Sequence, residues 1–483
     1  MPFAPEYIRL VLNENFEDAK ALFLDALMAI HYGHLAMLAE QGIIDRADAR
    51  AIRAALDGID LAAVRQTAYD GVSEDLFFHL NQLIAARCGA EVAGVLHTAR
   101  SRNDIDMTLY RMQIRQWVLM LADASLALRR SLIGVAERHR ETVFPAHTHG
   151  QPAQPTTLAH YLLAMVEQLE RDARRLVAAY VSTNRSPLGA CAITGTGFPI
   201  DRDRTSALLG FFGPTGNTYG SIATVDYMME STSAASTLVL GVGRFVQDML
   251  LWSTVEMGYL RLPDELVQKS SIMPQKRNPV ALEHTRAIAS RALGELHAAA
   301  SAAHNTPFGD IVDTEDDLQP LMALAFRDAT RATSLLAVTM AVAEFNVPRM
   351  RARAAEGWAS VTELADVLAR DHGVPFVIAH DIVSRFVRTV ADVSVEGVGE
   401  RLAEAARGCG RQIHYTDDAL RELLSPEHFV AVRRTHGGPA VEVIAAALVR
   451  SHELLREDER ELSGFRQSLA GADVERRAAV DRL

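Results

Sequence analysis

The sequence predicts an all-α protein organised around a bundle of long helices. Three observations predict it: long stretches without proline, apolar residues that recur within them at three- and four-residue steps, and glycine and proline gathered between them. Apolar residues at this spacing line one face of a helix. Typical globular helices run about 8–20 residues, so longer uninterrupted ones favour a bundle in which they pack side by side.

The first part of the chain, from about residue 16 to 105, predicts several helices of moderate length. Five long helices are then expected, over residues 106–140, 157–183, 225–252, 279–303 and 313–343. The last of them contains Pro320, which predicts a kink because proline lacks a backbone N–H.

After about residue 355 the expected helices shorten and glycine and proline return, before a final charged helix that we expect to present a solvated face. The pattern therefore predicts three domains. They are an N-terminal helical domain over residues 1–105, the central bundle over 106–355 and a small helical domain over 356–483.

Composition narrows the class of protein. A net charge of -12 argues against a general nucleic-acid binder. The three cysteines are scattered, which fits a reducing compartment and gives no thiolate metal site. The start of the chain is unlike a signal peptide, and the longest charge-free run, residues 205–225, contains a proline and several glycines, so it does not predict a membrane span. We expect a soluble cytoplasmic protein.

A polar loop precedes the expected helix of residues 279–303. This serine loop, residues 269–279, has the sequence KSSIMPQKRNP. Its prolines disfavour helix, and it leads into a helix N-terminus, where unpaired N–H groups and the dipole favour negative charge. Such a loop is suited to hold a carboxylate or to keep a serine hydroxyl deprotonated, with an ordinary polar surface loop as the alternative.

Two further polar segments adjoin long helices. The arginine loop, residues 97–104, has the sequence HTARSRND, which suits both a helix N-cap and a guanidinium clamp for a carboxylate. The histidine segment, residues 146–155, contains His147 and His149. A zinc site would need further ligands, and none stands nearby, so a capped loop or an acid–base histidine remains. The glycine-rich region 186–199 lacks the GxGxxG and GxxxxGK[ST] patterns, and nothing supports a nucleotide cofactor.

These segments together resemble the aspartase/fumarase superfamily. Residues 270–279 resemble its GSSxMPxKxNP loop, the arginine loop resembles the HTGRSRND segment of argininosuccinate lyases, and residues 148–155 resemble their THxQxAQP segment. Shorter matches follow at Pro187-Leu188-Gly189, Phe198 to Arg202, Glu363 to Asp366, Gly373 to Phe376, Phe429 and Arg433 to Gly438. The resemblance extends from about residue 20 to 450.

The resemblance implies a three-domain helical fold whose central bundle forms a homotetrameric core, with each active site shared by three subunits. It implies reversible elimination of fumarate from a succinyl-containing substrate, without a metal, nucleotide or redox cofactor. The implied catalytic residues are Ser270 as the base, Lys276 and Asn278 as donors to an aci-carboxylate intermediate, and His149, oriented by Glu283, near the leaving nitrogen. The implied substrate-binding residues are Ser101, Arg102, Asn103, Thr148 and Gln275.

Physical chemistry favours these roles. A proton next to an ionised carboxylate is weakly acidic, so fixed donors must stabilise the extra charge of the intermediate; removing one such donor costs about 2.7–4 kcal/mol in other enzymes. Serine becomes a plausible base only where backbone N–H groups, a helix end and Lys276 stabilise its oxyanion in a dry site. A mobile segment over residues 263–276 would close such a site.

The sequence departs from argininosuccinate lyases in two informative places. Lys269 stands where a glycine usually precedes the serine pair. In the acidic connector, residues 305–317, the family segment YN[RK]DxQEDK is altered: Asp310 replaces the tyrosine, Glu315 the glutamine and, just beyond, Leu318 the lysine. The family's N-terminal WGGRF segment is also missing.

Losing a cation and gaining acids predicts a different amine partner, because an unpaired buried charge is costly. The pattern resembles the ethylenediaminedisuccinate lyase branch, so we expect an N-substituted aspartate with a diamine leaving group as substrate. Argininosuccinate is the alternative. Adenylosuccinate is disfavoured because no phosphate-binding segment stands out. A structural crystallin-like role is disfavoured because the implied catalytic set is complete.

Overall fold

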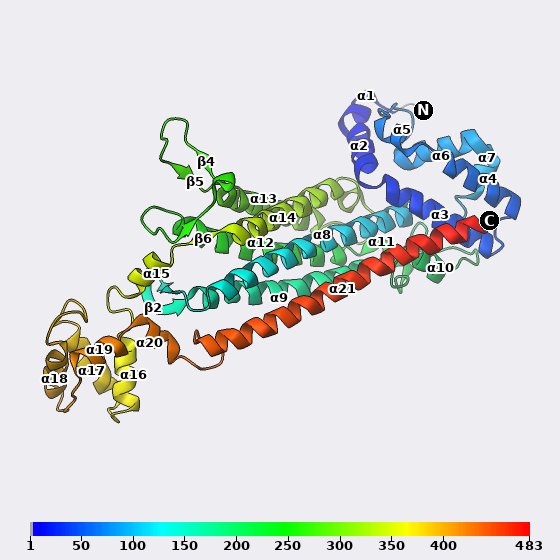
Figure 1. The fold of residues 1–483 in the computed structure, drawn as a ribbon. Helices are drawn as coiled ribbons and strands as arrows, with labels where there is room; N and C mark the ends of the chain where they lie inside the picture. The colour runs from blue at the N-terminus through cyan, green and yellow to red at the C-terminus, as the bar shows by residue number, and fades with distance from the viewer. Residues whose placement is uncertain (1–2) are drawn as a thin grey trace.

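The computed structural model describes residues 3–483, and it confirms the all-α fold class (Figure 1). The molecule is elongated: the bundle forms the middle, the N-terminal helices cluster at one end and a small helical unit lies at the other. The N-terminal cluster contains α1 Pro5–Tyr7, a π-helical turn Ile8–Leu12, α2 Asn13–Leu22, α3 Leu24–Glu40, α4 Arg46–Asp57, α5 Leu61–Gln66, α6 Leu76–Cys88 and α7 Ala90–Val95.

Five long helices form the bundle, as the periodicity predicts. They are α8 Arg102–Arg138, α9 Leu158–Thr183, α12 Asp226–Trp252, α13 Val280–Ala303 and α14 Gln319–Val342. Helix α8 begins four residues earlier than predicted, inside the arginine loop. Short helices α10 Arg202–Leu208 and α11 Thr218–Ala223 lie in the connection between α9 and α12.

The predicted kink at Pro320 is wrong. Pro320 lies in the first turn of α14, because the helix begins only at Gln319. A proline there interrupts no helical hydrogen bond, since the first N–H groups of a helix have no partner within it. Residues before it form a short 3-10 turn, Val312–Thr314, and a loop.

The bundle core consists of the apolar residues that recur at three- and four-residue steps along the long helices. Ile114, Leu121, Leu128 and Leu132 of α8 are fully buried against the neighbouring helices, and each such side chain contributes about 1.5–3 kcal/mol when it leaves water. Helix α12 is long and apolar enough to cross a membrane, but half of its most apolar stretch is buried inside the protein, which is the situation of a core helix.

The final helix, α21 Val441–Asp481, presents the expected solvated face, but its other face packs on the bundle rather than on the small unit. It runs back along the bundle, where it contacts α8, α9 and α3 (Figure 1). Leu448, Leu455 and Leu462, at seven-residue intervals among many charges, are buried against the bundle. Arg129 of α8 is fully buried and forms an ion pair with Asp458 of α21. This helix therefore belongs to the main core.

The small unit at the far end has a core of its own, which includes Leu364, Leu368, Phe386 and Leu402. Its helices are α16 Thr362–Arg370, α17 Phe376–Phe386, α18 Val398–Arg407 and α19 Asp417–Leu423. Helices α15 Val347–Ala354 and α20 Pro426–Ala431 join it to the bundle, where both contact residues 143–157. The predicted C-terminal region 356–483 thus consists of a compact unit followed by a helix that packs elsewhere.

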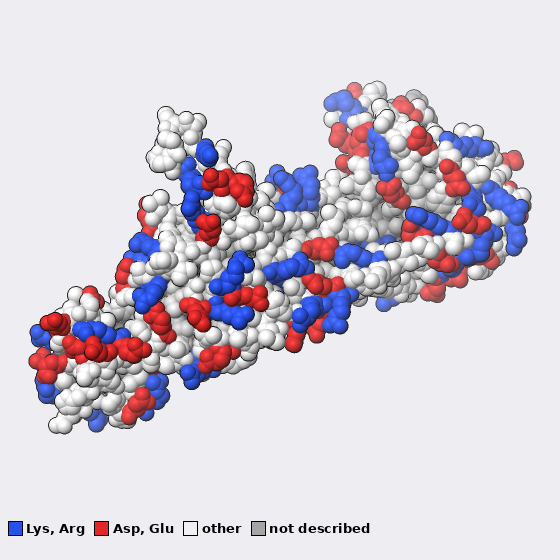
Figure 2. All heavy atoms as spheres, viewed as in Figure 1, with Lys and Arg blue, Asp and Glu red and all other residues white. Residues whose placement is uncertain are grey.

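Three antiparallel strand pairs supplement the helices. They are β1 Val143–Thr148 with β2 Gln151–Thr157, β3 Leu260–Arg261 with β6 Glu344–Phe345, and β4 Gln268–Lys269 with β5 Arg277–Asn278. The first and third pairs carry the predicted site segments. Figure 2 shows acidic and basic side chains interspersed over the viewed face, whereas the outer end of the hairpin between β4 and β5 is white, because residues 270–275 carry no charge.

Candidate active site

The serine loop is the tip of a projecting hairpin. Strands β4 and β5 pair Gln268 with Asn278 and Lys269 with Arg277, so residues 270–276 form the connection between them (Figure 1). Arg277 anchors the base through an ion pair with Asp264 and a hydrogen bond to the Leu262 carbonyl (2.7 Å). Lys269 lies within a strand, so the residue that replaces the usual glycine adopts an ordinary extended position.

The Ser270 hydroxyl oxygen sits where a negative charge would be favoured. It accepts hydrogen bonds from the backbone N–H groups of Met273 (3.0 Å) and Ile272 (3.4 Å). Asn278 is half-buried at the end of β5, and α13 begins two residues later. The two N–H donors favour an oxyanion over a neutral hydroxyl.

The rest of the serine loop is open to solvent. Gln275 and Lys276 are exposed, as is Glu283 in the first turn of α13. At the tip, Ile272 is 84% and Met273 41% exposed. Two apolar side chains held out in water at the end of a thin hairpin lack a covering surface, which suits a segment that closes over a partner.

The histidine segment forms a hairpin where a loop was expected. Residues Thr148 and Gln151 are the last pair of β1 and β2, which leaves His149 and Gly150 as a two-residue turn. Both have positive φ, 52° and 74°, as type I′ hairpin turns require. Thr148 and His149 are therefore presented at an exposed tip, and within residues 3–483 no hydrogen bond or ion pair joins His149 to Glu283.

The arginine loop lies at the beginning of α8. Ser101 is the N-cap residue, and its hydroxyl donates to the Asn103 side-chain oxygen (2.6 Å). The Arg102 guanidinium donates to Asp75 (2.6 Å) and lies 3.3 Å from Glu74. A substrate carboxylate at Arg102 would therefore share the guanidinium with carboxylates of the chain itself.

The acidic connector packs against this same end of α8. The Asn103 side-chain amide donates to Asp310 (2.5 Å), and the Tyr110 hydroxyl donates to Asp316 (3.1 Å). We call Asp75, Asp106, Asp310, Glu315 and Asp316 the acidic cluster, because each is tied to the others by contact or by charge.

Burial and the repulsion between neighbouring carboxylates raise the pKa of Asp106, Glu315 and Asp316. Burial, together with a hydrogen bond that the protonated Glu315 donates to Asp310, raises the pKa of Glu315 to about 8. The pKa of Asp106 is held well above its ordinary value by burial and by the charge of Asp316. Burial is the largest cause of both shifts, and the lowering effect of the nearby Arg102 does not offset it.

The predicted site residues fall into two groups at opposite ends of the bundle. Helix α8 has 37 residues and is about 55 Å long, with Ser101 before its first turn and the histidine hairpin just after its last. Helix α13 begins beside the serine loop and ends near the acidic connector (Figure 1). One copy of the chain thus brings Ser101, Arg102 and Asn103 together with the connector, but not with Ser270 or His149.

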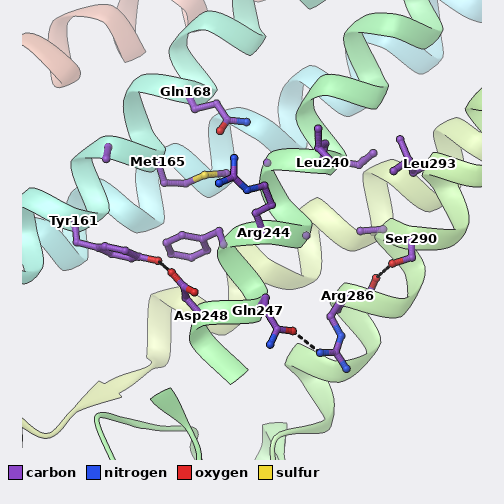
Figure 3. A pocket seen from close by; sticks show the side chains of 16 residues that line it. Tyr161, Met165, Gln168, Leu240, Arg244, Gln247, Asp248, Arg286, Ser290 and Leu293 are labelled. Carbon is purple, nitrogen blue, oxygen red and sulfur yellow. Dashed lines mark hydrogen bonds between the residues drawn. The ribbon is translucent and has the colours of Figure 1, made fainter. Parts of the chain in front are cut away.

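The bundle surface between these ends is hollowed. A groove of about 710 Å³ lies between α9, α12 and α13, and Figure 3 shows Met165, Arg244 and Gln168 around it. The Tyr161 hydroxyl donates to Asp248 (2.6 Å) at one end of it, and Arg286 donates to Gln247 (2.6 Å). None of the sequence-predicted site residues lines this groove. Over residues 3–483, no group of three or more His, Cys, Asp or Glu side chains is arranged to hold a metal ion.

Sequence reasoning did not single out Asp75 or Asp106. Asp75 lies in a loop before α6, and only the fold brings it to Arg102. Asp106 follows the arginine loop by two residues and was taken as the start of a helix. The signal available in the sequence was its spacing: Asp106 lies four residues after Arg102, so the two side chains share a face of the helix.

Comparison with known proteins identifies the family. Residues 29–294 match the model of the family described as "Lyase", and residues 358–431 match that described as "Argininosuccinate lyase C-terminal". The chain belongs to this lyase family, in the argininosuccinate lyase-like part of the aspartase/fumarase superfamily.

Similar sequences and a similar solved structure support this chemistry. The chain is 41% identical over 448 residues to "Argininosuccinate lyase 2" of Agrobacterium fabrum, covering 92% of this chain and 89% of the relative. It is 38% identical to the argininosuccinate lyase of Methanoculleus marisnigri, covering 94% and 92%. Among solved structures, EDDS lyase in complex with formate has a TM-score of 0.86 at 30% identity, covering 100% of this chain and 96% of that one. The protein is a carbon–nitrogen lyase that releases fumarate.

Proposed function

We propose that this lyase eliminates fumarate from an N-substituted L-aspartate whose leaving group is a diamine or polyamine, as in ethylenediaminedisuccinate. The observation that carries the proposal is the acidic cluster beside Asn103. Arg102 is the cation that contacts the cluster, and it is already paired with Asp75 and Glu74. A second ammonium group on the leaving amine would supply the missing positive charge.

The raised pKa values support the same ligand. A cation bound near Glu315 and Asp106 would favour their ionised forms, so part of its binding free energy would come from relieving their repulsion. A substrate without that second cation would leave the carboxylates unpaired, which disfavours it. The replacement of the family lysine by Leu318, which is buried, leaves this space without a built-in cation.

In the proposed reaction Ser270 removes the proton from the carbon next to a substrate carboxylate. The electron pair moves onto that carboxylate, whose second negative charge Lys276 and Asn278 stabilise. It then returns to form the carbon–carbon double bond of fumarate as the carbon–nitrogen bond breaks, and the nitrogen, protonated before it departs, leaves as the neutral amine. Thr148, Gln275 and the arginine loop would hold the carboxylates, and His149, oriented by Glu283, would lie near the departing nitrogen. The N–H groups that contact the Ser270 oxygen support its role as the base.

We further propose that the site is completed by other copies of the chain in a cytoplasmic homotetramer. The two groups of site residues lie at opposite ends of a bundle about 55 Å long, so an antiparallel neighbour would place one group beside the other. The groove in Figure 3 and the exposed apolar side chains of the bundle, Leu240, Leu251 and Val338, support burial against such a neighbour.

Argininosuccinate is the second candidate substrate. It is favoured by the names of the relatives that are 34–41% identical to this chain, all of them argininosuccinate lyases. Its guanidinium group would also bring positive charge to the acidic cluster. The two candidates differ in where the leaving group carries its positive charge. In ethylenediaminedisuccinate the charge lies on an amine nitrogen two carbons from the departing nitrogen, whereas in argininosuccinate it lies on the guanidinium that contains the departing nitrogen.

The deciding experiment follows fumarate absorbance with each substrate in parallel. We expect turnover of ethylenediaminedisuccinate and, in reverse, addition of ethylenediamine to fumarate. Efficient turnover of argininosuccinate alone would overturn the diamine proposal and leave the family chemistry intact. Absence of turnover with both substrates and with a panel of other diamines would overturn the proposed substrate class.

A further inference from the structure

Two residues with strained backbone conformations are in contact, one in the arginine loop and one in the glycine-rich region. Ala99 and Cys191 both lie in the left-handed region, with φ of 60° and 53°, although neither is glycine. They are 92 residues apart in the chain, and the Cys191 thiol donates to the Ala99 carbonyl (3.2 Å). Strained residues of this kind persist only where the surrounding contacts hold them in place, and they concentrate at functional sites.

One carboxylate holds both segments. Asp104 is fully buried. Its Oδ1 accepts from the Ser101 N–H (2.8 Å), and its Oδ2 accepts from the N–H groups of Gly189 (2.8 Å) and Cys191 (2.9 Å). The first bond is an ordinary helix-start contact. The other two reach the glycine-rich turn, whose role was not apparent from its sequence.

The glycine-rich turn is fitted closely to this contact. Gly189 has a φ of +91°, and a Cβ there would lie 2.7 Å from the Cγ of Arg202. Arg202 in turn donates from Nε to the Leu188 carbonyl (3.0 Å). A side chain at residue 189 would displace Arg202 and strain the backbone, so the N–H group is presented to Asp104 only with glycine at this position.

We propose that Asp104 is a positioning residue, which fixes Ser101, Arg102 and Asn103 for substrate by tying the arginine loop to the turn at Gly189 and Cys191. The inference rests on the proposed function for the role of those three residues. Asp104 itself would not touch substrate. It would act through the backbone of Ser101 and through the fixed position of the first turn of α8.

The charge of Asp104 is set by its surroundings on both segments. The groups that face it are Arg100 on its own loop and Cys191 and Arg202 on the opposite turn. Burial raises its pKa to about 6, against the lowering effect of the three N–H bonds and Arg100. The carboxylate is therefore ionised at neutral pH and becomes protonated below about 6, where it accepts the three N–H bonds more weakly. Loosening of both segments should set in together over that range.

The test combines Asp104→Asn with amide hydrogen exchange and kinetics. The amide side chain cannot accept from both segments, so exchange should become faster in residues 97–104 and 186–192 together. With the substrate that the fumarate assay selects, kcat/KM should fall by about tenfold to 100-fold, the range typical for groups that act through a neighbour. Most of this fall should appear as a rise in KM. The decline of kcat/KM as pH falls below about 6 should also become smaller in this variant.

Asp45→Asn is the matched control, since Asp45 likewise accepts a local backbone N–H bond at the beginning of a helix, from Asp48 (2.8 Å) in α4. It should alter none of these readouts. Wild-type protein provides a second measurement without any substitution: exchange, corrected for its intrinsic pH dependence, should become faster in both segments as pH falls from 7.5 to 5.

Unchanged exchange in residues 186–192 in both measurements would overturn the inference. If kcat/KM of Asp104→Asn still declined below about pH 6 as in wild type, the positioning role would be overturned even if KM rises. The exchange measurements need no substrate, so a failure of the proposed function would be seen separately, in the fumarate assay.

Discussion

The two ends of the bundle are built in opposite ways. At the serine loop, the predicted catalytic groups lie on projecting hairpins with exposed Ile272 and Met273 at one end, and they make few contacts within the chain. At the arginine loop, the predicted binding groups are half-buried, paired with carboxylates and tied to two other segments. The difference fits the proposed function, in which the serine loop would close over substrate and the arginine loop, held in place by its contacts, would select it.

Removal of the base should have the largest effect at the exposed end. Ser270→Ala should lower kcat about 100- to 10,000-fold, the range for a general base, and change the free energy of unfolding by less than about 0.5 kcal/mol. Steady-state kinetics and urea unfolding measure the two. Ser271→Ala is the control, and if it were the more damaging of the two, the base would be assigned to the wrong serine.

Loss of a donor to the intermediate should come next. Lys276→Met should lower kcat about 100- to 1,000-fold with a smaller change in KM, because its charge is needed most as the second negative charge develops on the carboxylate. Lys269→Met removes a cation from the same hairpin without that role and should be near neutral. Equal losses in the two variants would mean that only the overall charge of the loop matters.

Mixing variants from the two ends tests whether different copies supply them. Ser270→Ala and Asn103→Ala should each be inactive alone, whereas co-expressed chains should regain part of the activity, because some sites would combine one intact end from each. The assay is fumarate release by purified mixed oligomers. A mixture as inactive as its parents would contradict a site shared between copies.

Substitution of the connector should shift selectivity rather than abolish turnover. Restoring the family pattern with Asp310→Tyr, Glu315→Gln and Leu318→Lys should raise the preference for argininosuccinate over the diamine adduct about tenfold or more, equivalent to about 1.4 kcal/mol. The ratio of kcat/KM for the two substrates measures it. Asp313→Asn removes an exposed acid from the same connector and should leave the ratio unchanged; an equal shift would indicate a long-range charge effect.

The smallest predicted effect is on stability. The pKa of Glu315 is raised from 4.5 to about 8, so the folded state holds this proton more tightly than the unfolded chain. Its contribution to stability is therefore complete below about pH 4.5 and is lost as pH rises through 8. Melting temperature without ligand should decline over that range, less so in Glu315→Gln, and ethylenediamine should offset the decline in wild type. A flat wild-type profile would show that Glu315 is better solvated than its contacts indicate.

Much of this protein follows from local sequence. Apolar periodicity predicts the five bundle helices to within a few residues at most ends, because a helix that buries one face must repeat about every 3.6 residues. The serine, arginine and histidine segments were recognisable because each gathers unusual polar chemistry beside such a helix. Leu448, Leu455 and Leu462 also carried a pattern, but the charges around them disguised it.

Tertiary structure decided the rest. Whether Pro320 kinks a helix or begins one depends on where the preceding loop ends, and the turn of residues 149 and 150 needs the pairing of two proline-containing strands. Asp75 reaches Arg102, and Asp104 reaches Gly189, across 27 and 85 residues. Contacts of this kind leave no local period in a sequence, because they are set by the packing of whole helices rather than by neighbours along the chain.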